Sequence, residues 1–335
     1  MVGEMDDLRI MRSIIKTEDI VNQEEYRNIM CSVSGGSDSD VMLDICFRAD
    51  PGKKVSYVWF DTGLEYQATK EHIRFLEEKY GIHIYREKAV KSIPTCCREY
   101  GVPFLSKMVS SQISRLQAHG FRWEDLPYEV LLQKYPNCMS ALRWWCNMYD
   151  NPGYRTSSQF SIGRNKWLKE FLMAHPPWFP ISNKCCYYAK KKTSERFVKE
   201  NGIDLSLVGV RKAEGGVRAA AYSGCFTPGE EGKIAAYRPL FHYLNSTKEM
   251  YDGHYGIVHS RCYTEYGMKR TGCAGCPYNR DLLQELAVIE QHEPKLYRAI
   301  RTIFRDSYEY TRMYREFVRG FQKGGGKKNS VSGKA

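Results

Sequence analysis

The sequence predicts an α/β domain built around a mostly parallel sheet. Three observations predict it: apolar segments of strand length alternate with amphipathic helical segments, a Gly-rich turn follows the first apolar segment, and an Asp-Thr-Gly turn follows the second. Strands that alternate with helices form parallel sheets with right-handed crossovers. The carboxyl ends of parallel strands share one edge, which is where ligands bind in open α/β sheets.

The elements are expected in a regular order. Residues 1–25 are expected to form a polar helical lead-in, and a helix passes through residues 41–45 after the Gly-rich turn. A charged helix over residues 64–80 ends at Gly81, because glycine readily adopts the conformation that closes a helix. Strands are expected at residues 29–33, 55–60, 82–85 and 205–210, with a further candidate at residues 234–243.

The alternation stops between about residues 90 and 180. This stretch is rich in aromatic residues, Arg and Pro, and it predicts a helical insertion over the ligand-binding edge of the sheet. The α/β domain is therefore expected to span residues 26–280 and to include the insertion. Residues 281–322 predict a C-terminal helical segment, and the Gly-, Lys- and Ser-rich residues 323–335 predict a disordered tail.

Composition narrows the function classes. With 42% hydrophobic and 27% charged residues among 335, the chain resembles an ordinary globular protein. It contains no uncharged apolar run near the roughly 20 residues of a membrane helix, and Asp6 and Asp7 interrupt any signal peptide, so no membrane partner and a cytoplasmic location are expected. A net charge of +11 suits a polyanionic partner, although solubility alone also explains it.

The Gly-rich turn is a candidate phosphate site. It reads Ser34-Gly35-Gly36-Ser37-Asp38-Ser39, between a predicted strand and a predicted helix. Glycines let the backbone approach a phosphate, successive N–H groups form an anion-binding nest, and the helix dipole adds favourable potential. The alternative is an ordinary strand-to-helix turn in which Ser37 or Asp38 is the N-cap.

Two further turns are expected on the same edge of the sheet. Asp61-Thr62-Gly63 closes the second strand, where Asp61 suits a ribose or a metal ion, and an ordinary turn is the alternative. Arg211 and Arg218 follow the strand at residues 205–210 and suit the charge of a phosphate, although loop arginines are often only solvated.

Four of the twelve cysteines form a candidate metal site. Cys185 and Cys186 are adjacent, and Cys273 and Cys276 form a CxxC pair. An all-sulfur set suits zinc or an iron–sulfur cluster, and an adjacent Cys-Cys pair favours iron–sulfur. The pair at residues 96–97 is a rival. Two other cysteines, Cys31 and Cys46, lie in strand and helix patterns and are expected to be buried.

Together these residues resemble the phosphoadenylyl-sulfate/adenylyl-sulfate reductase family of the PP-loop ATP pyrophosphatase superfamily. The SGGxDS loop of that family matches residues 34–39, its LDTG motif matches residues 60–63 with Phe in place of Leu, and its Gly-x-Arg…Arg loop matches residues 209–218. The resemblance covers about residues 26–280 apart from the insertion. It implies a PP-loop fold, with ATP or adenylyl sulfate and Mg²⁺ bound at the first two motifs.

The resemblance also implies an iron–sulfur cluster. In the cluster-bearing members, a Cys-Cys pair, a basic pair and a distant CxxC bind a [4Fe-4S] cluster. Here these features correspond to the four cysteines named above, with Lys190 in the position of the family's cluster-side lysine. The implied catalytic residues are Asp38, Lys190, Arg211 and Arg218.

The sequence departs from the plain reductases in two ways. Their nucleophile is a cysteine in a C-terminal tail, whereas no cysteine follows Cys276 here, and the aromatic insertion is foreign to them. The chain is more similar to reductase-like proteins that activate a substrate with ATP, including those for DNA phosphorothioation and RNA thiolation. A cubane with four Cys ligands leaves no open iron. The sulfur is therefore expected from a persulfide on Cys262 or Cys225, each equally explained as structural, or from a partner such as a cysteine desulfurase.

Three functions remain open on the sequence: an adenylating sulfur-transfer enzyme for nucleic acid, a sulfonucleotide reductase, and a catalytically idle cluster-bearing binding module. Nucleic-acid contact is expected through basic and aromatic residues of the insertion and through arginines of the C-terminal segment. Core packing of the tryptophans and solvation of the arginines are the alternatives. The residues concerned are Arg115, Arg122, Arg143, Arg155, Arg164, Lys166, Trp123, Trp144, Trp145 and Trp167 in the insertion, and Arg298, Arg301, Arg305, Arg312, Arg315 and Arg319 in the C-terminal segment.

Overall fold

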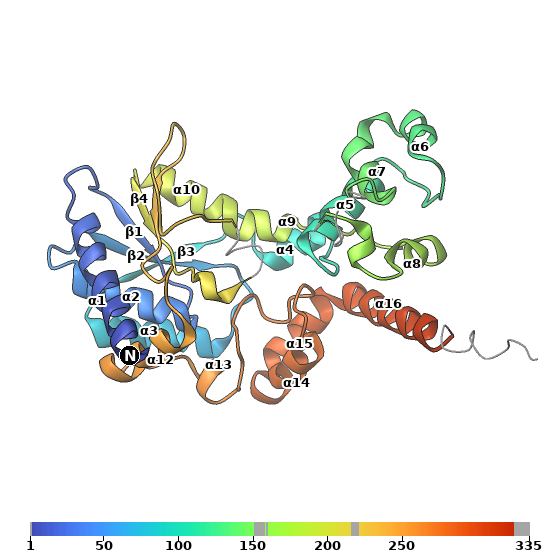
Figure 1. The fold of residues 1–335 in the computed structure, drawn as a ribbon. Helices are drawn as coiled ribbons and strands as arrows, with labels where there is room; N and C mark the ends of the chain where they lie inside the picture. The colour runs from blue at the N-terminus through green and yellow to red at the C-terminus, as the bar shows by residue number, and fades with distance from the viewer. Residues whose placement is uncertain (1, 151–157, 159, 216–220, 325–335) are drawn as a thin grey trace, which may run out of the picture. The chain divides into compact units, whose positions relative to one another are not determined.

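The computed structural model describes residues 2–150, 158, 160–215 and 221–324 (Figure 1). Its contacts divide the chain into two compact units. Unit 1 comprises Met1–Ser92, Tyr188–Ala274 and Val288–Glu293, and unit 2 comprises Ile93–Tyr187, Gly275–Ala287 and Pro294–Ala335. Among the helices in the described ranges, none is both long enough and apolar enough to span a bilayer.

Unit 1 is built around a six-stranded sheet whose strand order is β3-β2-β1-β4-β6-β5. All neighbouring strands are parallel except β5 and β6, which are antiparallel. The central strand β1 pairs Ile29 with Val55 of β2 on one side and with Leu205 of β4 on the other. The strands are β1 (Ile29–Ser32), β2 (Val55–Asp61), β3 (Ile84–Lys88), β4 (Leu205–Leu207), β5 (Phe226–Thr227) and β6 (Ala235–Tyr237).

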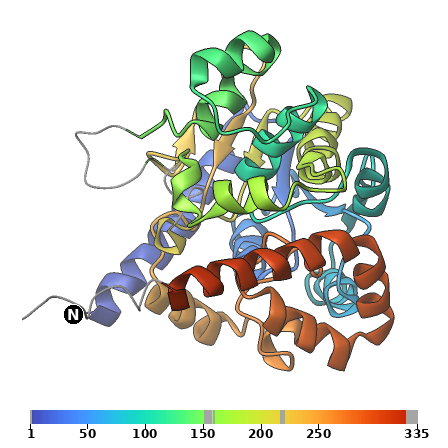
Figure 2. The ribbon, with the colours of Figure 1, turned by 90° about the vertical axis from the view of Figure 1, so that its right-hand side faces the viewer.

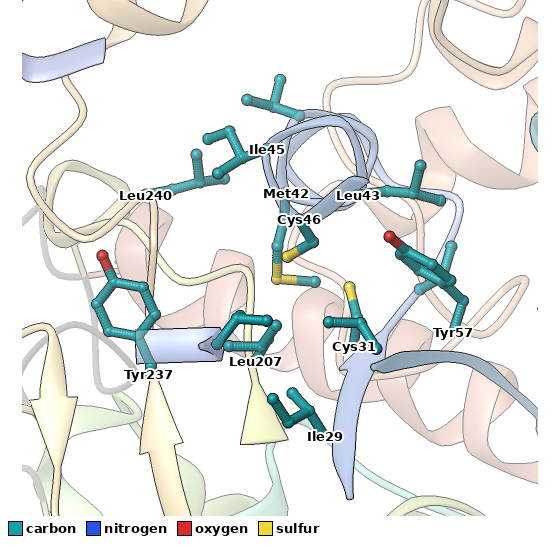
Figure 3. Packing of buried hydrophobic residues seen from close by; sticks show 14 of the residues in the cluster. Ile29, Cys31, Met42, Leu43, Ile45, Cys46, Tyr57, Leu207, Tyr237 and Leu240 are labelled. Atoms are coloured by element: carbon teal, nitrogen blue, oxygen red, sulfur yellow. The ribbon is translucent and has the colours of Figure 1, made fainter. Parts of the chain in front are cut away.

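Helices cover both faces of this sheet because successive strand residues point to opposite sides. On one face, Cys31 of β1 packs with Met42 and Cys46 of α2 (Figure 3). On the other face, Met30 of β1 packs with Phe197 of α10. The helices of this unit are α1 (Val2–Val21), α2 (Ser37–Ala49), α3 (Gln67–Tyr80), α10 (Lys192–Glu200), α12 (Asn245–Tyr255) and α13 (Arg261–Thr264).

Unit 2 is helical, and its core is aromatic. Trp144, Trp145, Phe104 and Phe171 are fully buried in it, and Tyr310 of the long α16 helix packs on both phenylalanines. Figure 2 shows the course of α16 as a long red helix. The helices are α4 (Ile93–Tyr100), α5 (Lys107–Ala118), α6 (Tyr128–Lys134), α7 (Met139–Trp145), α8 (Leu168–Ala174), α9 (Lys184–Cys186), α14 (Leu282–His292, which ends in unit 1), α15 (Pro294–Ile303) and α16 (Arg305–Gly324).

The predicted fold class is confirmed: the sheet is mostly parallel, the stretch after β3 is helical, and the chain continues in helices after the CxxC pair. The third strand begins two residues later than predicted. The reason is that the N–H of Ile82 donates to the Glu77 carbonyl at 3.2 Å and closes the last turn of α3 around Gly81. The predicted strand at residues 234–243 is shortened to β6, since the N–H of Phe241 turns back to the Arg238 carbonyl.

The predicted C-terminal helical segment is three helices with breaks at Glu293 and Phe304. The first break has a clear role in unit 1. The buried carboxylate of Glu293 accepts hydrogen bonds from the N–H groups of Gln67 and Ala68, at 2.8 and 3.2 Å. These N–H groups begin α3 and have no partner inside that helix, so Glu293 caps it.

Candidate functional site

A polar cavity of about 670 Å³ lies in unit 1 where β1 and β4 end. Most of its lining comes from three segments: the turn after β1, the turn after β4, and a segment just before the CxxC pair. Tyr222 and Asn245 complete the lining. The lining residues are Ser32, Ser34, Gly36, Ser37, Asp38, Ser39, Val208, Gly209, Val210, Arg211, Ala213, Glu214, Tyr222, Asn245, Tyr263, Lys269, Arg270 and Thr271. The cavity therefore brings together most of the predicted phosphate loop and one of the two predicted loop arginines.

The loop after β1 is shaped to present backbone N–H groups. Its turn is held by Ser34, whose N–H donates to Ser39 Oγ at 2.8 Å and whose own Oγ accepts the N–H of Gly36 at 3.3 Å. Gly35 has φ +67°, and a Cβ there would lie 2.9 Å from the Thr69 methyl group, so glycine is required. The N-cap of α2 is Gly36, without a side-chain cap, rather than Ser37 or Asp38. The first turn of α2 thus faces the cavity uncapped by a side chain, as an anion site requires.

Arg211 is fixed beside this loop. Its Nε donates to Asp38 Oδ1 at 2.9 Å, its Nη1 donates to Asn245 Oδ1 at 2.9 Å, and only 11% of its side chain is exposed. Its charge is therefore balanced by Asp38, while its planar fork stays oriented along the cavity wall. The other predicted arginine, Arg218, lies outside the described residues.

The second predicted turn, Asp61-Thr62-Gly63, is not among the described residues that line the cavity. Asp61 forms an ion pair with Arg86 of β3 and accepts the N–H of Gly63 at 2.9 Å, so its carboxylate is used within the turn. Thr62 donates to Glu65 at 2.6 Å and contacts Cys273 Sγ at 3.9 Å. The turn after β2 is thus directed toward the CxxC segment rather than the phosphate loop.

The segment before the CxxC pair forms a wall of the cavity that the sequence motifs do not assign. Tyr263 and Thr271 share a hydrogen bond of 2.9 Å between their hydroxyl groups, and the backbone of Ser37 also bonds to the Tyr263 hydroxyl. Burial raises the pKa of Tyr263 even though both bonds act to lower it. Lys269 and Arg270, which lie four and three positions before Cys273, complete this wall. Their basic charge is the sequence signal that points to them.

A buried network of charged side chains packs against α2, the helix that follows the Gly-rich turn. Asp40, fully buried in α2, accepts from His259 Nδ1 at 2.8 Å and lies 3.0 Å from His72 Nε2. Asp252 lies 3.1 Å from His259 Nε2 and 2.6 Å from Lys248 Nζ. Burial lowers the pKa of His259, but its bonds to Asp252 and Asp40 outweigh burial and raise the pKa to about 9. The imidazolium form therefore holds α12 and the 259–274 segment against the helix that carries the phosphate loop.

Three of the predicted cluster ligands meet within unit 2. The thiol of Cys185 interacts with Cys186, Cys97 and Cys276. A hydrogen bond with Cys186 lowers the Cys185 pKa, but a bond with Cys97, burial and the charge interactions with Cys97 and Cys276 together raise it. Sulfur donors of this kind are the ligand type that iron–sulfur clusters take. In the described residues no three acidic, His or Cys side chains are arranged around a single metal ion.

Cys97 comes close to the predicted ligands because α4 is tied to the chain before α9. The N–H of Val102 donates to the Pro180 carbonyl, and the N–H of Ser182 donates to the Val102 carbonyl, both at 3.0 Å. The rival pair at residues 96–97 therefore contributes one thiol beside the predicted site. Cys273, the fourth predicted ligand, belongs to unit 1.

The CxxC loop is clamped by the C-terminal helices of unit 2. Glu285 of α14 accepts the N–H of Gly275 at 3.2 Å, and Tyr308 of α16 donates to the carbonyl of Gly275 at 2.5 Å. Gly275 has φ +61°, and a Cβ there would lie 2.4 Å from Ile300 Cδ1. Only glycine therefore fits at the centre of the loop, between Ile300 of α15 and Tyr308 of α16.

The other predicted functional residues have mixed outcomes. Lys190 is exposed in unit 1 and lowers the pKa of Glu65, whose net shift is upward because of burial. Cys262 is fully buried beside Thr69, and burial raises its pKa, which disfavours it as a persulfide carrier. Cys225 is half-buried, 3.4 Å from Lys16 Nζ.

The expected stacking role of the insertion tryptophans is wrong for Trp144 and Trp145. Trp144 and Trp145 are fully buried, and Trp123 packs edge-on against Trp145, because these rings form the core of unit 2. Trp167 is 41% exposed but stacks on Phe321 of α16. Arg155 of the insertion lies outside the described residues.

The C-terminal arginines line a second cavity, of about 530 Å³, within unit 2. Its wall also contains Leu282, Leu283 and Leu286 of α14 and three acidic residues. We call it the arginine groove. The arginines that line it are Arg301, Arg305, Arg312, Arg315 and Arg319.

A parallel α/β sheet with an uncapped helix N-terminus at its carboxyl edge is an arrangement that suits an anionic ligand. Residues 28–105 match the model of the phosphoadenosine phosphosulfate reductase domain, which confirms the resemblance inferred from the motifs. A protein of Methanocaldococcus jannaschii, MJ0066, described as uncharacterized, is 27% identical over 183 residues. That match covers 52% of this chain but only 34% of MJ0066, so the chain spans about a third of the relative's length.

Solved structures show weaker similarity. Phosphoadenylyl-sulfate reductase of Candida auris has a TM-score of 0.43 and 13% identity, covering 77% of this chain and 87% of its own. FMN adenylyltransferase of Candida glabrata has a TM-score of 0.42 and 10% sequence identity, and the match covers 81% of this chain and 63% of that protein. The U34-tRNA thiolase NcsA of Methanococcus maripaludis, with its [4Fe-4S] cluster, has a TM-score of 0.38 and 13% sequence identity. That match covers 94% of this chain and 80% of the thiolase. Similarity at this level does not establish a function.

Proposed function

We propose that the protein is an ATP-dependent, adenylating sulfur-transfer enzyme with a [4Fe-4S] cluster, and that its acceptor is a nucleic acid. The observation that carries the proposal is the cavity in unit 1. It combines an uncapped helix N-terminus and a Gly-Gly turn with three cationic side chains. The turn and the helix N-terminus lie within residues 28–105, which match the phosphoadenosine phosphosulfate reductase domain model. Its volume of about 670 Å³ is of the size that ligand sites in proteins commonly have.

In the proposed reaction, an oxygen of the acceptor attacks the α-phosphorus of ATP, and the bond from that phosphorus to the bridging oxygen breaks. Pyrophosphate leaves, and a sulfur nucleophile then displaces AMP from the acceptor. The backbone N–H groups of residues 34–39 and the cations Arg211, Lys269 and Arg270 stabilise the charge that develops on the leaving pyrophosphate. Asp38 keeps the Arg211 fork oriented. Bound together with ATP, Mg²⁺ would supply further positive charge to offset that of the phosphates.

Cys185, Cys186, Cys273 and Cys276 are the proposed ligands of the cluster. When bound, the cluster supplies soft iron sites that suit sulfur ligands. Cys273 and Cys276 lie in the CxxC loop. Gly275 allows the turn of that loop, and hydrogen bonds from Tyr308 and to Glu285 fix it. Since Cys262 is buried, the sulfur comes from a partner such as a cysteine desulfurase or from a persulfide on the half-buried Cys225.

The arginine groove supports a nucleic-acid acceptor. Arg301, Arg315 and Arg319 line it, and none of the three has a carboxylate within ion-pair distance among the described residues. Unpaired arginines in a concave surface are suited to phosphodiester oxygens, which they bind through paired N–H donors.

The test is to measure two activities side by side on the anaerobically purified protein. Exchange of labelled pyrophosphate into ATP, in the presence of unmodified RNA or DNA as acceptor, is expected. Replacing Arg211 with Ala is expected to lower the exchange rate about 100-fold, because one preorganised donor to the transition state is lost. Lys199→Ala, a change of an exposed lysine of α10, is the matched control.

The other outcomes identify the alternatives. Sulfite release from adenylyl sulfate without pyrophosphate exchange would assign the protein to the sulfonucleotide reductases. If neither activity is found while the cluster and nucleic-acid binding are present, the protein is a binding module without catalytic activity.

A further inference from the structure

The segment that precedes the CxxC pair is anchored at both ends on unit 1. At its start, His259 bonds to Asp40 of α2, and at its end the N–H of Ala274 donates to the Leu64 carbonyl at 3.0 Å. Between these anchors, the N–H of Met268 donates to the Cys262 carbonyl at 2.9 Å and directs the chain into the cavity. Residues 269–271 then line the cavity, and Cys273 follows two residues later, beside Thr62.

Direct contacts join this segment to the phosphate loop. The Tyr263 hydroxyl bonds both to the backbone of Ser37 and to Thr271 Oγ1. A Cβ placed on Gly36 would lie 3.4 Å from the Tyr263 hydroxyl and 3.5 Å from Thr271 Oγ1. The segment therefore lies against the loop at the point where a phosphate would bind, so an anion there must contact both.

The segment contributes two positively charged side chains to the cavity. Arg211 is balanced by Asp38, which leaves Lys269 and Arg270 as the cavity cations that have no carboxylate within 4.0 Å in the portion of the chain that the structure describes. Both side chains are exposed to solvent. Two unbalanced cations beside a helix N-terminus favour an anion with at least two charges, such as the phosphates of a nucleotide.

We propose that residues 269–273 form a phosphate-binding arm, in which Lys269 and Arg270 bind the phosphates of the nucleotide and which thereby couples phosphate binding to Cys273. The inference rests on the proposed nucleotide site and adds two binding residues and a coupling to it. Only two residues, Thr271 and Gly272, separate Arg270 from Cys273, so ordering Arg270 restricts Cys273. Coupling of this kind is reciprocal: a nucleotide that orders the arm also restricts access to the Cys273 thiol.

The first measurement is the affinity for MgATP by calorimetry. The double variant Lys269→Ala/Arg270→Ala is expected to bind MgATP about 10- to 100-fold more weakly, because charge-assisted bonds to phosphate are lost. The double variant Arg74→Ala/Lys199→Ala removes the same two charge types from exposed helix positions of unit 1 and is expected to bind like the unmodified protein.

The second measurement uses metal-free protein and the thiol reagent N-ethylmaleimide, with modified cysteines quantified by mass spectrometry. Saturating MgATP is expected to slow the alkylation of Cys273 about fivefold and to leave Cys146 of unit 2 unchanged. In the Lys269→Ala/Arg270→Ala variant, MgATP at equal occupancy is expected to give no protection of Cys273.

The outcomes separate this inference from the proposed function. If the unmodified protein binds MgATP and the double variant binds it equally well, or if Cys273 reacts at the same rate with and without MgATP, the arm is overturned while the nucleotide site stands. If the unmodified protein binds no MgATP, the proposed function fails and the arm fails with it.

Discussion

The molecule contains two basic cavities that are built on different principles. In unit 1, the cavity is made largely from backbone: a turn with Gly35 at φ +67° and the N-terminus of α2 present N–H groups, and Asp38 balances Arg211. In unit 2, the arginine groove is made from side chains on α15 and α16, above leucines of α14. Its acidic neighbours Glu309 and Glu316 both pair with Arg312, at 2.5 and 2.7 Å.

This difference determines which kind of anionic ligand each cavity suits. Backbone N–H groups at fixed positions recognise the geometry of one phosphate group, so the first cavity suits a small nucleotide. Long arginine side chains adapt to a run of phosphates and contribute mainly through charge, so the second suits a polyanion. The predictions below test this contrast, in order of decreasing expected effect.

The largest effect is expected at the CxxC sequence, which has one cysteine in each unit. Anaerobically purified protein is expected to carry about four irons per chain, and Cys273→Ser is expected to abolish this, because a cubane needs its thiolate ligands. Iron and sulfide analysis together with the visible spectrum measures it. Cys31→Ser, which changes a buried core residue of β1, is the control and is expected to keep the iron. Stoichiometric zinc without iron would contradict the assignment.

The next effect tests the backbone cavity. Gly36→Val is expected to weaken MgATP binding at least about 100-fold, since the new side chain fills the space between Ser34, Tyr263 and Thr271 where a phosphate would approach. Calorimetry measures the affinity, and circular dichroism shows whether the fold is kept. Gly253→Ala is the matched control, because a Cβ there meets no atom within 4 Å. Unchanged affinity in Gly36→Val would show that the loop is not the site.

A smaller effect is expected from the charge network under the phosphate helix. The folded-state pKa of His259 is raised from 6.5 to about 9, so its contribution to stability is fully present below about pH 6.5. It is lost as the pH rises through about 9. The expected decrease in the free energy of unfolding is about 2 kcal/mol, after allowing for solvent screening of this partly exposed ring.

Urea unfolding at pH 6, 8 and 9.5 measures this decrease. His259→Gln is expected to remove most of the difference between these pH values, whereas His254→Gln, an exposed histidine of α12, is expected to leave it. An equal pH dependence in all three proteins would exclude the network as its source.

The smallest effect distinguishes arginines within the groove. Arg315→Ala is expected to weaken the binding of a short single-stranded RNA about tenfold and to lower the salt slope by about one, as expected for one lost phosphate contact. Arg312→Ala is expected to do less, because Glu309 and Glu316 already neutralise Arg312. Fluorescence anisotropy at several salt concentrations measures both. An equal loss in the two variants would mean that the groove acts through total charge alone.

The turn after β1 was predictable because its shape depends on backbone geometry encoded in consecutive residues. Residues 34–39 contain the glycines and serines that form the turn, and a strand and a helix flank them as expected. Asp61 was predicted for the same cavity on the assumption that strand ends converge. Its carboxylate is instead paired with Arg86, which lies 25 residues away on the next strand. Nothing in the Asp-Thr-Gly sequence reveals that partner.

The sequence by itself determined the order of strands and helices, the position of the phosphate turn and the excess of basic residues. These depend on local propensity, hydrophobic period and composition, which are properties of neighbouring residues. The tertiary structure alone decided that Trp144 and Trp145 are core residues rather than a stacking surface. It also decided that Lys269 and Arg270 face a phosphate loop more than 200 residues earlier in the chain, because long-range packing brings such segments together and leaves no local signal.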